Sequence, residues 1–189
     1  MKEIRISNIK IEKRNDSQKD MVLVGRPILF NTPTTIGKDN LAFTEVIQHG
    51  ALDGVDLNDT RLLYNHDLNK VPLAKTPKTM QLELDQAGLK MVATLADTEE
   101  SKSVYTAVKR GDLSGMSFAF KVPEGGDSYD AHTRTRTIHK IERIYEISIV
   151  PFPAYPTTSV EARSAFNELD SKERSNLRIK LNKTLFKGE

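Results

Sequence analysis

Apolar residues recur at every second position in several separate runs of this chain, and this spacing constrains its fold more than any other feature. The clearest case is a pair of runs over residues 80–84 and 89–95, separated by a turn signal at residues 85–88. Side chains at alternate positions of a strand point to the same face, so each run predicts a strand with one buried face. Two such runs joined by a short turn predict a β-hairpin.

Other segments follow the same pattern less regularly. Further strands are expected over residues 4–11, 21–30, 61–64, 116–122 and 134–150. The first of these changes phase, which a bulge near Ser7 and Asn8 would explain. Pro27 places the second at a sheet edge or a strand end, because proline has no backbone N–H to donate. The last becomes apolar on both faces, as expected of a central strand.

Two segments predict helix. Residues 97–110 have an apolar stripe at helical spacing and good signals at both ends. Asp97 is the expected N-cap, Glu100 completes a capping box, and Gly111 is the expected stop. A short helical turn is also expected over residues 44–49, where a glycine follows.

These elements indicate a mainly β fold with a few helices, of the α+β class. A closed or nearly closed β-barrel is the expected architecture, because closure removes exposed strand edges. Residues 1–160 are expected to form one domain. Beyond it, Leu177, Leu181 and Leu185 recur every four residues among charges, which predicts an amphipathic helical tail over residues 161–189.

Composition excludes several classes of protein. The 28 basic and 26 acidic residues are interleaved and sum to +2, which favours a mixed solvated surface and no specific nucleic-acid partner. No run approaches the roughly 18 apolar residues of a membrane span. The N-terminus alternates charges with isoleucines, so a cytoplasmic location is expected rather than secretion. The absence of cysteine rules out disulfides, a thiol nucleophile and thiolate metal sites.

Common motifs for metals and cofactors are also missing. The four histidines form no HExxH pair, which argues against a zinc site. The sequence contains no GxxxxGK[ST] or GxGxxG, and no GxSxG elbow of the α/β-hydrolase type. We therefore expect neither a metal nor a cofactor.

Glu146 is the most informative single residue. It lies in the apolar run of residues 144–150, where a carboxylate would be buried. A buried charge is costly unless it is paired, so Glu146 requires a partner. An imidazole would serve. The alternatives are an ion pair with an arginine such as Arg143 or Arg136, or exposure at a sheet edge.

A hydroxyl and an imidazole complete a chemically useful set. Ser117 shares the small face of its expected strand with Ala119, although a serine there can simply fill a tight spot. Ser114 is a rival hydroxyl that suits a turn better. His66 ends the strand 61–64, and the alternative interpretation is a loop histidine bonded to its neighbours. Together with Glu146, these residue types are the ones that a Ser–His–acid mechanism requires.

At five places the sequence resembles the tailed-bacteriophage prohead protease family, which is related to the herpesvirus capsid maturation proteases. The pieces are residues 43–51 (FTEVIQHGA), 62–67 (LLYNHD), 85–89 (DQAGL), 111–120 (GDLSGMSFAF) and 145–155 (YEISIVPFPAY). The resemblance extends from about Val24 to Val160, and its specificity comes from the order and spacing of the pieces.

The resemblance implies a barrel-like serine protease that acts inside the assembling prohead in the host cytoplasm. It assigns the catalytic residues as His66, Ser117 and Glu146. Glu45 also matches a family position, interpreted as structural or substrate-positioning. Relatives cleave the major capsid protein or scaffold segments and themselves, so these are the expected partners, and self-association into a homo-oligomer is compatible with the family.

Two further expectations come from the same resemblance. The tail over residues 161–189 would be a docking segment or a self-cleaved one. By analogy with the viral relatives, Arg134 or Arg136 would support backbone N–H groups in binding the oxyanion, with plain surface charge as the alternative.

Two rival functions remain at this point. One is a non-catalytic prohead assembly or scaffold protein of the same fold, against which the presence of His66, Ser117 and Glu146 argues. The other is a small β-barrel that binds nucleic acid. That function is disfavoured because aromatic residues are only 6% of the chain and tryptophan is absent, so bases would find few stacking partners.

Overall fold

A computed structural model describes residues 3–8, 21–37 and 42–151 of the chain. In this part of the chain one helix accompanies twelve strands, which confirms the mainly β, α+β class. The strands are β1 (Glu3–Asn8), β2 (Val22–Leu29), β3 (Thr34–Ile36), β4 (Phe43–Ile47), β5 (Arg61–Tyr64), β6 (Ala74–Lys75), β7 (Met80–Asp85), β8 (Gly88–Thr94), β9 (Gly115–Lys121), β10 (Asp127–Asp130), β11 (Thr135–Ile138) and β12 (Arg143–Val150). The helix is α1 (Glu99–Arg110).

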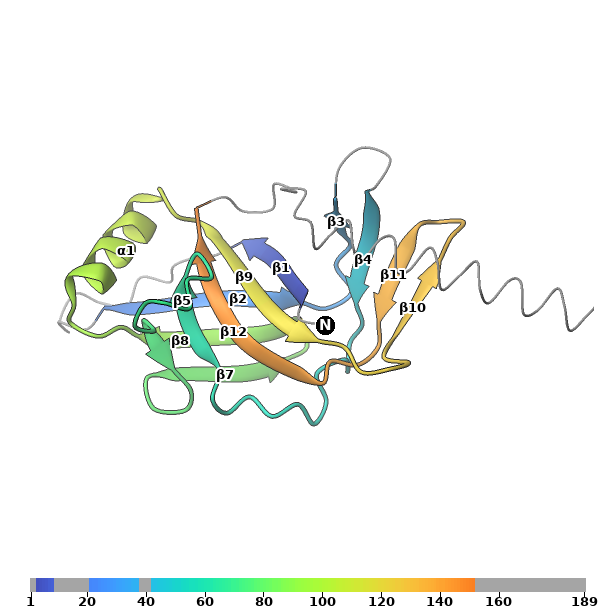
Figure 1. Ribbon diagram of the computed structural model, residues 1–189, viewed down its shortest axis with the longest axis horizontal. Coiled ribbons are helices and arrows are strands. Elements are labelled where there is room, and N and C mark those ends of the chain that lie inside the picture. Colours follow the sequence, from blue (N-terminus) through green and yellow to red (C-terminus); the bar gives the residue numbers. More distant parts are fainter. Residues whose placement is uncertain (1–2, 9–20, 38–41, 152–189) are drawn as a thin grey trace, which may run out of the picture.

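The strands form three open sheets. A five-stranded sheet has the order β1-β9-β12-β5-β6, a four-stranded sheet the order β10-β11-β4-β3, and a three-stranded sheet the order β2-β8-β7. The three- and five-stranded sheets cross one over the other, with α1 at one end and the four-stranded sheet at the other (Figure 1). The expected closed barrel is not found, because no backbone ladder joins the edge strands of one described sheet to those of the next.

The three-stranded sheet confirms the predicted hairpin. Strands β7 and β8 pair antiparallel through a turn that ends at Gly88, whose φ is 145°. A Cβ atom at Gly88 would lie 2.0 Å from the carbonyl oxygen of Ile28, so only glycine fits there. Strand β2 is an edge strand, and its register with β8 shifts between Gly25 and Ile28, on either side of Pro27. The expectation for Pro27 is therefore also confirmed.

The helix begins one residue later than the capping box predicts. Thr98 is the N-cap, and its side chain accepts a 3.2 Å hydrogen bond from the backbone N–H of Ser101. Asp97 instead forms an exposed ion pair with Lys102. The expected stop is confirmed, because Gly111 has a φ of 89° and its N–H caps the last turn.

Two predictions of secondary structure are wrong, one for residues 44–49 and one for residues 134–150. The helical turn expected over residues 44–49 is not found: residues 44–47 belong to strand β4, because Phe43, Glu45 and Ile47 are buried in strict alternation. Residues 134–150 form two strands, β11 and β12, which belong to different sheets. The break falls where the backbone N–H groups of His139 and Lys140 both bond to the carbonyl of Gly126.

Strand β12 contains a bulge that decides which side chains meet the core. Its register with β9 shifts between Ile144 and Glu146, so one extra residue, Tyr145, is accommodated there. Without the bulge, Ile144 and Glu146 would share a face. With it, Ile144 joins Ile147 on the core face, and Glu146 points to the other. As predicted for this segment, β12 lies in the middle of its sheet.

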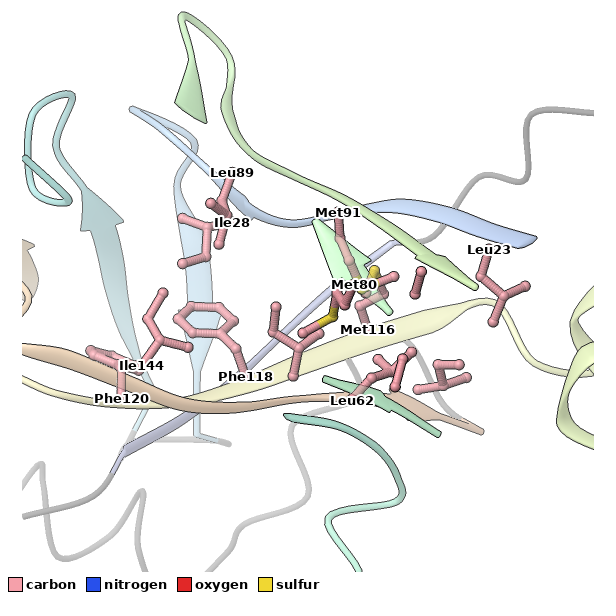
Figure 2. Packing of buried hydrophobic residues seen from close by; sticks show 14 of the residues in the cluster. Leu23, Ile28, Leu62, Met80, Leu89, Met91, Met116, Phe118, Phe120 and Ile144 are labelled. Atoms are coloured by element: carbon pink, nitrogen blue, oxygen red, sulfur yellow. The ribbon is translucent and has the colours of Figure 1, made fainter. Parts of the chain in front are cut away.

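The core lies between the three- and five-stranded sheets. Figure 2 shows apolar side chains from the two sheets facing one another across it. The labelled members are Leu23, Ile28, Met80, Leu89 and Met91 on one side and Leu62, Met116, Phe118, Phe120 and Ile144 on the other, each at most 2% exposed. Burial of one such side chain stabilises the fold by about 1.5–3 kcal/mol, and a one-residue slip of β9 or β12 would turn these side chains away from the core.

Some expectations concern residues outside the described part of the chain. These are residues 9–11 of the first expected strand, the domain boundary near residue 160 and the helical tail over residues 161–189. Among the helical residues that are described, none form a helix long and apolar enough to cross a membrane.

Candidate active site

Glu146 is a buried carboxylate on the face of the five-stranded sheet that points away from the main core. Its side chain is 2% exposed, and both carboxylate oxygens accept hydrogen bonds. Oε1 lies 2.8 Å from Nδ1 of His66, and Oε2 accepts a 2.6 Å hydrogen bond from the hydroxyl of Ser148. The predicted need for a partner is therefore met by an imidazole, and neither Arg143 nor Arg136 fills that role.

His66 reaches Glu146 from a tight turn at the end of β5. Asn65 and His66 have φ values of 52° and 59°, and the N–H of Asp67 donates to the carbonyl of Tyr64 at 3.1 Å. Two consecutive positive φ values closed by this hydrogen bond define a turn of the type I′ kind. Asparagine and histidine tolerate such a conformation better than most residues. The turn directs the His66 ring back over the sheet toward Glu146.

The pairing of β5 with β12 holds this turn in place. The two strands run parallel, and the ladder is extended by a 2.9 Å hydrogen bond from the N–H of Asn65 to the carbonyl of Ile149. The next N–H, that of His66, donates to the hydroxyl of Ser148 at 3.1 Å. Both the backbone and the ring of His66 are thus bound to side chains of β12.

Ser117 lies on β9, the strand on the other side of β12 from β5. In the antiparallel register Ser117 is directly opposite Ser148, and Ala119 is opposite Glu146. Residues directly opposite each other in an antiparallel pair have Cβ atoms about 4.5–5.5 Å apart. Ser117 therefore shares a sheet face with Ser148 and Glu146, one strand away from the group that holds His66.

These side chains differ in their access to solvent. Ser117 and Ser148 are 0% exposed and Glu146 is 2% exposed, whereas the His66 side chain is 24% exposed. Only the imidazole of this group reaches the surface. Among the described residues, no buried side-chain nitrogen or oxygen lacks a hydrogen-bond partner, so the polar groups on this face are all satisfied.

The loop that follows His66 is anchored to the helix. Lys70 forms a 2.8 Å ion pair with Glu100 near the start of α1. The hydrogen bond to the Glu100 carboxylate and its negative charge raise the pKa of Lys70 above its usual value. The contact links the segment after the histidine to an element 30 residues later in the chain.

Ser148 is the residue of this group that sequence reasoning missed. It bridges Glu146 and the backbone of His66, yet in the sequence it is one small residue in an apolar run. A usable signal was present, because Glu146 and Ser148 are the two polar residues of residues 146–150 and are two apart. That spacing places both on one face of a strand.

Glu45 belongs to a second buried network, in the four-stranded sheet. Glu45 on β4 is directly opposite Arg136 on β11, and its Oε2 lies 3.0 Å from an Arg136 guanidinium nitrogen. Nε of Arg136 donates to Asp127 at 2.7 Å. Glu45 and Arg136 are only 2% and 4% exposed, so Arg136 is not plain surface charge.

The remaining polar candidates are used elsewhere. Ser114 lies between Gly111 and the start of β9, in the turn region that the sequence suggested for it. The ring of His139 bonds to Ser128 and Gln48, at 2.7 and 2.6 Å, and His49 packs edge-on against Phe30. Within the described ranges, no three His, Asp or Glu side chains gather as a metal site would require.

Comparison with known proteins identifies one family. Residues 7–172 match the sequence model of a family described as caudovirus prohead serine protease. This range contains His66, Ser117, Glu146 and Ser148. The search of curated proteins finds no match. The search of solved structures finds none either.

Proposed function

The chain belongs to the caudovirus prohead serine protease family, and from this premise we propose that it is a serine endopeptidase of capsid maturation. Its proposed substrates are the major capsid protein, scaffold segments, and its own chain. Its proposed place of action is the assembling prohead inside the host cell.

One observation carries the proposal: a buried carboxylate holds the histidine ring through Nδ1. Because Oε1 of Glu146 lies 2.8 Å from Nδ1 of His66, the neutral ring keeps its proton on Nδ1. The lone pair of Nε2 is then free to accept a proton. The negative charge of Glu146 also stabilises the imidazolium that forms when it does so.

Ser117 is the proposed nucleophile. Its Oγ attacks the carbonyl carbon of the scissile peptide bond while Nε2 of His66 takes the hydroxyl proton. Nε2 then gives this proton to the leaving amine, and an acyl-enzyme remains. A water molecule repeats the sequence in the second half-reaction, which releases the new carboxylate and restores the Ser117 hydroxyl.

Backbone N–H groups near Ser117 are the proposed donors to the oxyanion. Arg136 is a poor candidate for this role, because its guanidinium is buried against Glu45 and Asp127. This network supports the structural interpretation of Glu45 over the substrate-positioning one.

The burial of Ser117 adds a condition on activity. With 0% of its surface exposed, Ser117 cannot contact a peptide in the conformation described. Cleavage therefore requires a local movement around Ser117 that lets a substrate peptide reach its hydroxyl.

The test is co-expression of the full chain with its capsid protein, followed by mass spectrometry of both. The wild-type chain should yield shortened capsid protein and a chain clipped in residues 161–189. The Ser117→Ala variant should lower cleavage by about 10⁴-fold or more, because it removes the attacking oxygen. Its unfolding temperature should stay close to that of the wild type.

Ser114→Ala is the matched control, since Ser114 is the nearest other serine in the sequence and should be dispensable for cleavage. Undiminished processing by Ser117→Ala would contradict the assignment of the nucleophile. Uncut capsid protein with the wild-type chain, in proheads that still assemble, would favour the non-catalytic assembly role instead.

A further inference from the structure

The inference concerns Ser148, a buried serine for which the proposed mechanism has no use. Ser148 lies between Glu146 and His66, which are the carboxylate and the base of the proposed mechanism. Its hydroxyl donates to Oε2 of Glu146 at 2.6 Å and accepts the backbone N–H of His66 at 3.1 Å. With the 2.8 Å contact between Glu146 and the His66 ring, these bonds close a cycle of three hydrogen bonds.

The direction of each bond in the cycle is determined by chemistry. A backbone N–H can only donate, so the Ser148 oxygen must be its acceptor. An ionised carboxylate can only accept, so the Ser148 hydroxyl must point its proton at Glu146. That proton is therefore not available for transfer to Nε2 of His66. The same hydroxyl cannot serve as the nucleophile without breaking the cycle.

The backbone bond has a specific purpose. In a two-residue turn the N–H of the second central residue has no partner within the turn. Here that residue is His66, with a φ of 59°. An unpaired N–H beside a buried face would be costly, and Ser148 satisfies it. The turn conformation that aims the ring is thus stabilised by the same side chain that holds the carboxylate.

We propose that Ser148 is a positioning residue, which orients Glu146 and the His66 turn together so that the imidazole keeps its proton on Nδ1. This role rests on the proposed protease function and deepens it. It assigns a fourth side chain to the site and separates the two serines that face each other across β9 and β12. Ser117 attacks the substrate, and Ser148 prepares the base.

The test compares Ser148→Ala with Ser117→Ala and with Ser101→Ala. Ser101 is a matched control because it is equally buried, at 1% exposed, but lies on α1. Activity is measured on a peptide that spans the cleavage site found by co-expression. Ser148→Ala should lower kcat about 10- to 100-fold, the effect of losing one hydrogen bond to a charged group, with little change in KM. Ser101→Ala should leave kcat within about twofold of wild type.

A second measurement reports the cycle without activity. An imidazole N–H bonded to a carboxylate gives a far-downfield proton resonance, which His66→Ala identifies by its loss. This resonance should be present in the full-length wild type and in Ser117→Ala. It should weaken or vanish in Ser148→Ala and return in Ser148→Thr, which restores the hydroxyl. Ser148→Thr should also recover most of kcat.

Labelling with a fluorophosphonate, which reacts with activated serines, shows whether Ser117 or Ser148 is the nucleophile. It therefore distinguishes failure of the positioning role from failure of the proposed protease function. The label should attach to Ser117 in the wild type and, more slowly, in Ser148→Ala. Attachment to Ser148 would overturn the positioning role, as would full kcat and an unchanged resonance in Ser148→Ala. If Ser148→Ala does not fold, a folded Ser148→Thr without the resonance overturns it. Undiminished cleavage by Ser117→Ala would instead refute the proposed function itself.

Discussion

Two carboxylates of this protein are equally buried, and both lie within strands, but their side chains bind very different partners. Glu146 in the five-stranded sheet and Glu45 in the four-stranded sheet are each 2% exposed and each lie within a strand. Glu45 is paired with the guanidinium of Arg136, which also binds Asp127. Glu146 is paired with the imidazole of His66 and the hydroxyl of Ser148.

This difference in partners shows that a buried carboxylate can serve either as a fixed structural contact or as part of a group that exchanges a proton. A guanidinium is always protonated in proteins, so the Glu45 network has one charge state and acts as a fixed crosslink between β4 and β11. An imidazole can accept a proton on one ring nitrogen and release it again, so the Glu146 network can change its charge state in the course of a reaction. Only the second arrangement is suited to move a proton during a reaction.

Among changes to the two carboxylate networks, the largest expected effect comes from Glu146→Gln. This change keeps the shape of the side chain but removes the charge that stabilises the imidazolium. It also weakens the preference for the Nδ1-protonated ring. We expect kcat on the cleavage-site peptide to fall about 10³- to 10⁴-fold, while thermal unfolding shows a folded chain.

Glu45→Gln is the matched control for this comparison. It makes the same chemical change in an equally buried strand residue, and kcat per folded molecule should stay within a few-fold of the wild type. Similar losses of kcat in both variants would mean that Glu45 contributes to substrate positioning after all, and the contrast between the two networks would fail.

The next largest effect is a loss of folding stability in the Arg136→Met variant. Removing the guanidinium leaves Glu45 and Asp127 close together without the cation between them. Breaking a buried ion pair in this way costs about 3–5 kcal/mol in the free energy of unfolding, which urea titration measures. The folded fraction should keep its kcat.

Arg143→Met provides the reference for that measurement. Arg143 is exposed and lies over the ring of Tyr145, 5.2 Å from its centroid. Loss of such an exposed cation–π contact should cost only about 0.5–1 kcal/mol. Equal destabilisation by Arg136→Met and Arg143→Met would show that the buried network is not a structural crosslink.

The smallest effect concerns a carboxylate at the surface. The Arg26 guanidinium, with help from the N–H groups of Ala87 and Gly88, holds the pKa of Asp85 well below its usual range. A lowered pKa in the folded state stabilises the fold above the ordinary pKa of aspartate, and this contribution is lost as the pH falls through the lowered pKa.

Arg26→Ala should therefore destabilise the protein slightly at pH 7, and the difference from wild type should shrink as the pH is lowered below about 4. Urea unfolding at several pH values measures it. Because this pair is partly exposed, salt should also reduce the difference. A difference that grows on acidification would contradict the role of the ion pair.

Much of the fold follows from local patterns that can be read in the chain. Alternation predicts β7, β8 and β9 because one face of each meets the core, and Pro27 predicts an edge strand because it lacks a donor. Where local patterns mislead, tertiary contacts are responsible. The local sequence of residues 44–49 predicts a helical turn, but in the folded chain β4 lies between β11 and β3 and pairs with both.

The candidate site, too, has features that the sequence predicts and features that depend on the tertiary structure. An unpaired glutamate in an apolar run indicates by itself that Glu146 needs a buried partner, because desolvation of a charge does not depend on the details of the fold. The choice of His66 as that partner was one of several alternatives. Ser148 could not be assigned, since its role depends on strand pairings and on the turn that follows β5.

The sequence alone determined that this chain is built of strands, that it resembles a prohead protease family, and which hydroxyl, ring and carboxylate are candidates for chemistry. Tertiary structure decided that the sheets stay open and that a bulge at Tyr145 turns Glu146 away from the core. It also decided that Ser148 joins the carboxylate to the histidine turn. The physical reason is range: burial preferences act residue by residue, whereas hydrogen bonds between residues 80 positions apart exist only after the strands have paired.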